Sequence, residues 1–283
     1  MARFTNFATL SYNGVTTDSN TVTGELLETL SVVKTAVTDQ YTTDDTVTYV
    51  LSLINSGTSA ITGITVTDDL GGYDLDTATL YPLHYTADSL QYYVNGVLQT
   101  APAVTAGPPM VISGISVPAG GNVQLVYETA VTAYAPLGTD AAITNTVTLT
   151  GNGISTPLTA QETVTMESRA DLTISKALYP SAVAENGQLT YTFVIANTGN
   201  TAATASDDVI LTDTFNPILD PITVTFNGTA WTEGVHYTYD PTTGVFTTLA
   251  GQITVPAASY MQNPDGTWMT TPGTSTLVIT GTV

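Results

Sequence analysis

The chain has 283 residues, no cysteine and a formal net charge of −20, with four Lys and Arg against 24 Asp and Glu. This charge excludes electrostatic binding to nucleic acid and to anionic membrane surfaces, and it leaves divalent cations as the small partners that the surface would attract. The absence of cysteine excludes disulfides, thiol chemistry and cysteine metal sites.

Charged residues make up 10% of the chain, against about 25% in ordinary soluble proteins. Thr, Val, Ala and Gly take their place, which is typical of β-sandwiches. No apolar run is long enough for a membrane span. The first residues lack the basic region and apolar core of a Sec signal peptide, so we expect no such signal.

The first stretch of the chain alternates in character with a period of two, as a half-buried strand does. Its apolar face is predicted to consist of Phe4, Asn6, Ala8, Leu10 and Tyr12. Asn13-Gly14 follows as a turn pair, and residues 1–28 contain one or two strands without a core of their own. A lone hairpin is marginal in water, so this segment must pack on something else.

Residues 29–167 contain short alternating segments, separated by Gly, Pro and Asn, which predict an immunoglobulin-like β-sandwich. Three polar residues occupy core-facing positions of these strands: Lys34, Asp68 and Asn145. The strand of Asn145 is the last of the set, although residues 156–166 extend the domain.

Residues 168–283 repeat the same pattern. Lys176 and Asp213 take the positions of the first lysine and aspartate, and the distance from lysine to the Tyr of Thr-Val-Thr-Tyr or Leu-Thr-Tyr is 15 residues in both repeats. No strand in this second repeat corresponds to the one that carries Asn145. The sequence therefore predicts an all-β protein of two tandem sandwiches, the second of which lacks its last strand.

The strand of Asn6 matches that of Asn145, and each precedes the following lysine by a similar distance, 28 and 31 residues. We therefore expect residues 1–28 to be a donor-strand tail that completes the second sandwich of another copy, head to tail, in an open filament. Two alternatives remain: the tail closes its own second sandwich, or it is a disordered leader.

The buried lysines point to a specific chemistry. Burial favours the neutral forms of lysine and aspartic acid, and a neutral amine is a nucleophile. If an Asn lies beside the pair, the aspartic acid can polarise its amide and shuttle protons while the amine displaces ammonia. We predict isopeptide bonds between Lys34 and Asn145 within one chain and between Lys176 and Asn6 of two chains, with Asp68 and Asp213 as the autocatalytic residues. The alternative is that both Lys–Asp pairs are salt bridges and that the asparagines bond to backbone groups.

Several segments resemble a known family: Thr-Val-Thr-Tyr, Asn-Ser-Gly, Thr-Val-Thr-Asp and Ile-Thr-Asn-Thr-Val-Thr. They are similar to the bacterial conserved-repeat modules of surface proteins and to isopeptide-bonded sandwiches of the collagen-adhesin type. The two-repeat organisation also resembles endospore appendage subunits of anaerobic spore-formers. This resemblance implies an extracellular protein on a cell or spore surface, released without a signal peptide.

We therefore expect a structural protein that needs no cofactor and binds no metal, and we do not expect an enzyme. The competing hypothesis is a monomeric adhesin or carbohydrate-binding module that uses exposed aromatics such as Trp231, Trp268, Tyr92 and Tyr93. A secreted hydrolase is a third hypothesis, but the sequence shows no catalytic constellation for it.

Overall fold

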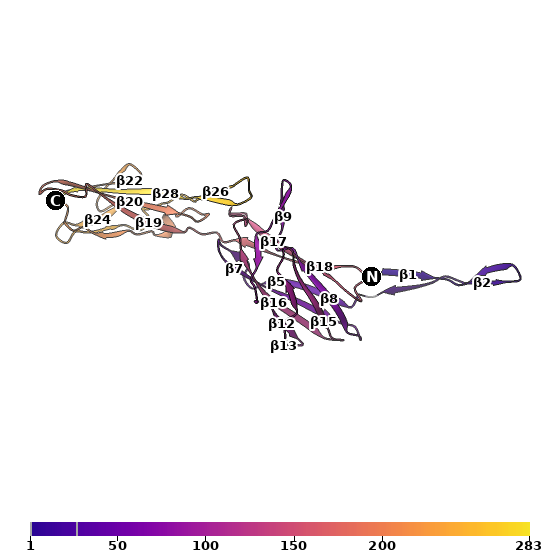
Figure 1. Cartoon of the computed structure of the whole chain (residues 1–283). Coiled ribbons are helices and arrows are strands. Elements are labelled where there is room, and N and C mark those ends of the chain that lie inside the picture. The colour runs from indigo at the N-terminus through magenta and orange to yellow at the C-terminus, as the bar shows by residue number, and fades with distance from the viewer. Residues whose placement is uncertain (1, 27) are drawn as a thin grey trace. The chain divides into compact units, whose positions relative to one another are not determined.

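The computed structural model describes residues 2–26 and 28–283. The described chain is all-β, as the sequence predicts, and its only helical segment is a single 3-10 turn at Ala205–Asp207. No helix in the described ranges is long and apolar enough to cross a membrane. The chain forms two compact units, one built from the residues up to Pro136 with Ala142–Thr165, the other from Leu137–Ala141 with Met166–Val283. Figure 1 shows the strands of the first unit in purple to magenta and those of the second in orange to yellow.

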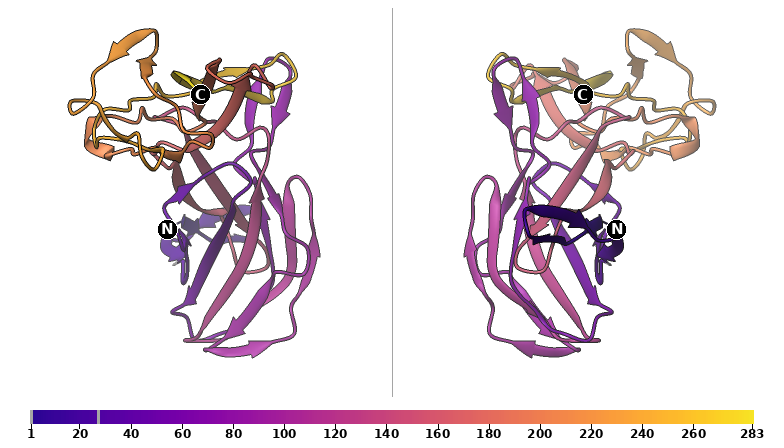
Figure 2. Two further views of the ribbon diagram at one scale, coloured as in Figure 1. Left: turned by 90° about the vertical axis from the view of Figure 1, so that its left-hand side faces the viewer. Right: turned by 90° about the vertical axis from the view of Figure 1, so that its right-hand side faces the viewer.

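The first unit is a sandwich of two sheets whose long strands run side by side (Figure 2). In spatial order, the first sheet contains β13 (Val97–Gln99), β12 (Gln91–Val94), β16 (Asn122–Val131), β7 (Thr46–Asn55) and β5 (Leu30–Ala36), and β11 (Leu83–Tyr85) also pairs with β16. The second sheet contains β14 (Ala103–Thr105), β15 (Met110–Val117), β8 (Ile61–Asp68), β17 (Ala142–Thr150), β18 (Leu158–Met166) and β6 (Gln40–Tyr41). A two-stranded hairpin, β9 (Tyr73–Leu75) with β10 (Ala78–Leu80), completes the unit.

The core of this sandwich follows the period-two alternation of its strands. In β7, every second residue from Val47 to Leu53 is fully buried, and in β17 the same is true of Asn145, Val147 and Leu149. The two sheets therefore each contribute to the core the side chains on one face of their strands, which are the side chains that alternation in the sequence predicts to be buried.

The second unit repeats the first sheet but has a shorter second one. Its first sheet contains β19 (Leu172–Tyr179), β20 (Gln188–Asn197), β28 (Gly273–Thr282), β22 (Ile222–Phe226) and β23 (Thr229–Trp231). The other sheet has three strands: β21 (Thr212–Thr214), β25 (Val245–Thr248) and β24 (Tyr237–Asp240), and a separate hairpin joins β26 (Ser259–Gln262) to β27 (Trp268–Thr271). Side chains from both sheets, such as Phe193, Leu277 and Phe246, form one buried cluster.

The Asn-x-Gly motif has the same structural role in both units. The Asn55 side chain accepts a hydrogen bond from Gly57 N and donates to the carbonyls of Val117 and Pro118. Asn197 likewise accepts from Gly199 N and donates to the Pro256 carbonyl. Each asparagine thus satisfies buried backbone groups where the second strand of the sandwich ends.

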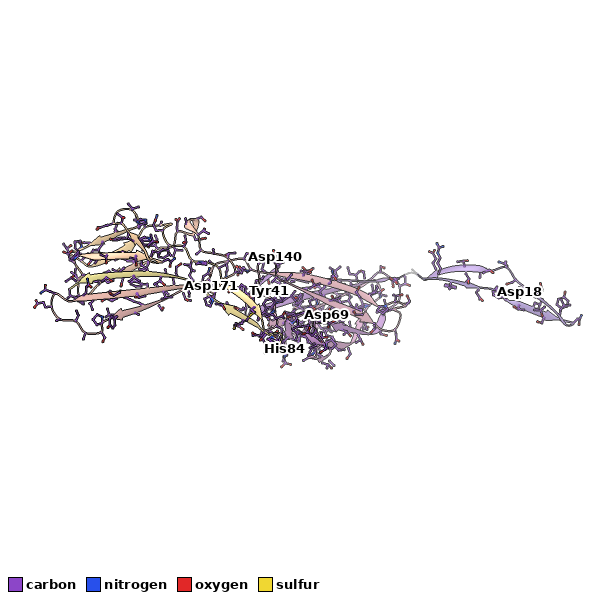
Figure 3. The ribbon with its side chains drawn as sticks, turned by 90° about the horizontal axis from the view of Figure 1, so that it is seen from above. Asp18, Tyr41, Asp69, His84, Asp140 and Asp171 are labelled. Atoms are coloured by element: carbon purple, nitrogen blue, oxygen red, sulfur yellow. The ribbon has the colours of Figure 1, made fainter. Side chains whose placement is uncertain are left out.

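The N-terminal segment forms a two-stranded ribbon that turns at Asn13-Gly14, in line with the strands and turn pair expected there, and each side of the ribbon is divided into two short strands. β1 (Ala2–Asn6) pairs with β4 (Val22–Leu26), and β2 (Thr9–Tyr12) pairs with β3 (Val15–Asp18). Asn13 and Gly14 make the turn with φ angles of 47° and 77°, the conformation that an Asn-Gly hairpin requires. Figure 3 shows the ribbon, on which Asp18 is labelled, and the side chains of the ribbon project outward from both strands.

Candidate cross-linking sites

Lys34 and Asp68 form a fully buried ion pair in the core of the first sandwich. Lys34 lies on edge strand β5, Asp68 is the last residue of β8 in the facing sheet, and both side chains are 0% exposed. The distance from Lys34 Nζ to Asp68 Oδ2 is 2.8 Å. Since isolated buried charges cost several kcal/mol each, this pair must be held by further contacts.

Asp68 has three hydrogen-bond donors around its carboxylate. Leu70 N donates to Oδ1 at 2.8 Å, and Oδ2 accepts from both Lys34 Nζ and the hydroxyl of Tyr127 on β16. Burial raises the pKa of the Tyr127 hydroxyl, so this group remains a proton donor at ordinary pH. The carboxylate is thus fixed in position and its oxygens are occupied.

Asn145 lies on β17 beside this pair. Val147 is the register partner of Asp68, so Asn145 is two residues further along the same face of the neighbouring strand. The side chain is 0% exposed, and neither its oxygen nor its nitrogen has a hydrogen-bond partner among the described residues. An unpaired buried polar group costs about 1–3 kcal/mol, so this amide is placed at an energetic cost.

Tyr49 on β7 connects the lysine to the asparagine. Lys34 Nζ lies 4.6 Å from the centroid of its ring. Burial raises the pKa of the Tyr49 hydroxyl, and the Asn145 amide partly opposes this shift. The two groups are therefore neighbours, although the hydroxyl makes no hydrogen bond of normal geometry in the described chain. The sequence analysis did not identify Tyr49 or Tyr127 as part of the site, although both lie on the core face of their strands.

The lysine is shifted toward its neutral form. Burial lowers the pKa of Lys34 below the usual 10.5, and the charge of Asp68 opposes this shift in part. Transfer of one proton from Nζ to Oδ2 would leave a neutral amine and a neutral acid, so that neither side chain is buried with a formal charge. The first site therefore brings together an amine of lowered pKa, a carboxylate bonded to it and an unpaired amide.

The second unit has the same lysine and aspartate in a more open setting. The distance from Lys176 Nζ to Asp213 Oδ2 is 2.5 Å, but the two side chains are 40% and 18% exposed. Lys176 Nζ lies 4.5 Å from the centroid of the Tyr191 ring, as Lys34 does over Tyr49. Nothing in the described second unit stands where β17 stands in the first, because β21 pairs only with β25.

An open apolar groove marks this place. Ile174 and Leu178, on the lysine face of β19, are 57% and 43% exposed. A cavity of about 310 Å³ runs between β19 and the segment that leads into β21. Its lining is mostly apolar and consists of Leu172, Ile174, Ile195, Val209, Ile210, Leu211 and Ile253 with Thr173 and Thr212.

Asn6, the remaining predicted site residue, lies on β1 of the N-terminal ribbon with an exposed side chain. Ala8 is exposed as well, and Phe4, Leu10 and Tyr12 are each more than half exposed. The core-facing pattern of this strand therefore has no core to face within the ribbon itself.

Other predicted features differ in outcome. No group of three or more His, Asp or Glu side chains within residues 2–26 and 28–283 is arranged to hold a metal ion.

The four aromatic residues expected to be exposed, Trp231, Trp268, Tyr92 and Tyr93, are only partly exposed. Trp231 stacks on Phe226 and His236, and the Tyr92 hydroxyl donates to the Ser116 carbonyl, so these rings belong to the fold. The Asp69 carboxylate, labelled in Figure 3, accepts a hydrogen bond from Thr146 N and so links the end of β8 to the neighbouring strand β17.

No protein-family model and no curated protein matches this chain. Among solved structures, it is similar to the pilus backbone RrgB of Streptococcus pneumoniae, at 10% identity and a TM-score of 0.35, over 83% of this chain and 52% of that one. The chain thus spans about half the length of that protein. It is also similar to BcpA, the major pilin subunit of Bacillus cereus, at 11% identity and a TM-score of 0.36, over 96% of this chain and 73% of that one.

A family 123 glycoside hydrolase from Clostridium perfringens also matches, at 6% identity and a TM-score of 0.33, over 49% of this chain and 27% of that one. Two pilus subunits and an enzyme are therefore similar to the chain at comparable, low TM-scores. Likeness of this degree carries no argument about what this protein does.

Proposed function

We propose that this protein is the structural subunit of a self-assembling extracellular filament on a cell or spore surface, polymerising head to tail by donor-strand complementation. One observation carries the proposal. The first sandwich has β17 over its Lys34–Asp68 pair, whereas in the second Lys176 and Asp213 are 40% and 18% exposed and are close in sequence to Ile174 and Thr212, which line an apolar groove. The exposed strand of Asn6 has the side-chain pattern of β17, and we propose that it fills this groove in a neighbouring copy.

Isopeptide bonds would make each closure permanent. In the first sandwich, neutral Lys34 Nζ attacks Cγ of Asn145 to form the new C–N bond, while Asp68 passes a proton from Nζ to the leaving nitrogen. The Cγ–Nδ2 bond breaks and one ammonia departs, so amine and amide become a secondary amide and ammonia. No external acid, base or oxidant is needed.

In the second sandwich the same step would join Lys176 to Asn6 of the incoming copy, with Asp213 as the relay. Insertion of the strand would exclude water from the half-exposed pair and bring it to the buried state of the first pair. The reaction would therefore follow docking. In this proposal the protein acts on no substrate other than itself.

The proposal is tested by electrophoresis of assembled material after boiling in detergent. We expect a ladder of covalent multimers from the native chain. Lys176→Arg is the matched control, because arginine keeps the cation but is no amine nucleophile. This variant should assemble and then run as a monomer after boiling. If the native assembly also runs as a clean monomer, no bond joins the subunits.

A further inference from the structure

The two units differ by more than one strand. In the second unit, β24-β25-β21 corresponds in order and pairing to β14-β15-β8 of the first, since each forms a hairpin whose second strand pairs with the aspartate strand. Beyond this strand the first unit continues through β17, β18 and β6, whereas the described second unit stops. A single donated strand would still leave an open sheet edge.

The N-terminal ribbon has the form of the β17–β18 hairpin. Asn145 on β17 pairs with Glu162 on β18, and Asn6 on β1 pairs with Val22 on β4. An Asn-Gly pair follows seven residues after each asparagine, at Asn152-Gly153 and Asn13-Gly14. Threonines pair directly across both hairpins one residue before the asparagine, Thr144 with Thr163 and Thr5 with Thr23.

Apart from Phe7, which is exposed and lies between β1 and β2, the ribbon also has two chemically distinct faces. Its polar face carries an ion pair between Arg3 and Glu25 and hydrogen bonds from Thr9 to Asp18 and between Ser11 and Thr16. Its other face carries exposed apolar side chains from both strands: Phe4, Leu10, Tyr12, Val15 and Val22. An apolar face of this extent on an isolated ribbon indicates a surface that becomes buried elsewhere.

The polar and apolar faces of β1–β4 continue into β2–β3 because the strand pairing shifts by one residue between them. Between the Asn6–Val22 and Thr9–Asp18 pairs, two residues on one strand oppose three on the other, which is a β-bulge. Val15 and Val22 are seven residues apart, an odd number that would place them on opposite faces of a regular strand. The extra residue of the bulge places both on the face of Phe4 and Leu10.

Size is balanced across the strands as well. Where β17–β18 pairs Ile143 with Val164, the ribbon pairs Phe4 with Gly24. The Phe4 ring covers this glycine, and a Cβ at residue 24 would lie 2.4 Å from Phe4 Cζ. The ribbon thus pairs a large side chain with a glycine at the position where β17–β18 pairs two side chains of medium size.

We infer that the donated element is the whole hairpin, residues 2–26, which docks closed on a second copy of this chain. β1 and β2 pair with the aspartate strand of the acceptor as β17 does, and β3 and β4 take the place of β18. This inference rests on the proposed function and specifies its interface. In the first unit, β6 begins six residues after Lys34 and pairs with β18. The corresponding residues of the second unit, Ala182 and Val183, follow Lys176 at the same spacing but form no strand. We expect them to pair with the donated β4 once the hairpin has docked.

A disulfide across the hairpin tests the inference. Thr5→Cys combined with Thr23→Cys places two cysteines directly opposite each other on the polar face of a chain that has no other cysteine. Cα atoms of antiparallel partners are about 4.5–5.5 Å apart, within the range of disulfides. Assembly of the oxidised and reduced forms is compared by light scattering and by the detergent-resistant ladder.

We expect the oxidised variant to assemble at the rate of the reduced one, because docking does not open the hairpin. If the reduced form assembles and the oxidised form does not, a single strand is donated and the inference is wrong while the proposed function stands. If neither form nor the native chain assembles, the proposed function itself fails.

Discussion

Lys34 and Lys176 occupy equivalent positions in two sandwiches with the same strand order in their first sheet, but they differ in their contact with solvent. Lys34 is fully buried with Asp68, whereas 40% of the Lys176 side chain is exposed. The difference follows from one neighbour, the strand β17, which covers the first pair and supplies an amide that finds no hydrogen bond. A buried amine of lowered pKa next to an unpaired amide is costly, and perturbed groups of this kind are common at functional sites.

The first prediction concerns Asn145→Ala. We expect the native chain to be lighter by one ammonia than its sequence requires, and the variant to have the full mass of its own sequence. By analogy with a disulfide that closes a loop of about 100 residues, loss of the bond should lower the free energy of unfolding by ~5 kcal/mol. Intact mass and denaturant unfolding measure the two effects.

Thr146→Ala is the matched control for this variant, since Thr146 neighbours Asn145 on the opposite face of β17. It should retain the loss of ammonia. A native chain of full sequence mass would contradict the first cross-link.

The second prediction concerns pH in the Asn145→Ala variant, where Lys34 stays a free amine. Burial lowers the pKa of Lys34 below 10.5. Between the lowered value and 10.5 the unfolded chain binds more protons than the folded one, so stability should rise with pH in this window. If the proposed bond forms in the native chain, Lys34 Nζ becomes an amide nitrogen that does not titrate, so this contribution should be absent there.

The measurement is denaturant unfolding below pH 10. Above that value the sign reverses, because burial raises the pKa of Tyr49 and Tyr127 above 10.0 and ionisation of the unfolded chain then favours unfolding. Parallel pH profiles for the variant and the native chain would show that Lys34 is not the titrating group.

At the scale of strands, alternation in the sequence was enough to predict an all-β chain and to place Lys34, Asp68 and Asn145 on the core sides of their strands. Alternation could not predict the two tyrosines of the first site, because which core side chains meet depends on how the two sheets stack. The Asn13-Gly14 pair did indicate the turn of the N-terminal ribbon, but alternation could not predict the register shift between its two paired segments, because no period-two pattern reveals a bulge.

The third prediction distinguishes the two faces of the N-terminal ribbon. Leu10→Asp puts a charge on the apolar face, and burying it in the groove beside Asp213 would cost several kcal/mol. We expect this variant to remain monomeric. Sedimentation of the assembly reaction measures the effect.

Ser11→Asp, one residue later and on the polar face, is the control for charge alone, since its cross-strand partner Thr16 is neutral and has a hydroxyl that can donate to the new carboxylate. It should assemble within a few-fold of the native rate. Equal inhibition by both substitutions would mean that repulsion in a chain of net charge −20 controls assembly, and not the apolar face.

At the scale of the whole molecule, the proposed contact joins the exposed apolar face of the N-terminal ribbon to the open apolar groove in the second unit of another copy. A contact between two different surfaces of identical subunits need not close, and repeated contacts of this kind give a filament. The same two surfaces within one chain would give a monomer, so the central question is which copy of Asn6 meets Lys176.

Mixed isotopic labelling answers it directly. Chains labelled with heavy isotopes and unlabelled chains are combined before assembly, digested with a protease, and the cross-linked peptides containing Asn6 and Lys176 are weighed. The account predicts peptide pairs in which one partner is heavy and the other light, at about half of the total when the two chains are mixed equally. Pairs of uniform label only would mean closure within one chain, and the absence of any Asn6–Lys176 peptide would mean that the bond does not form.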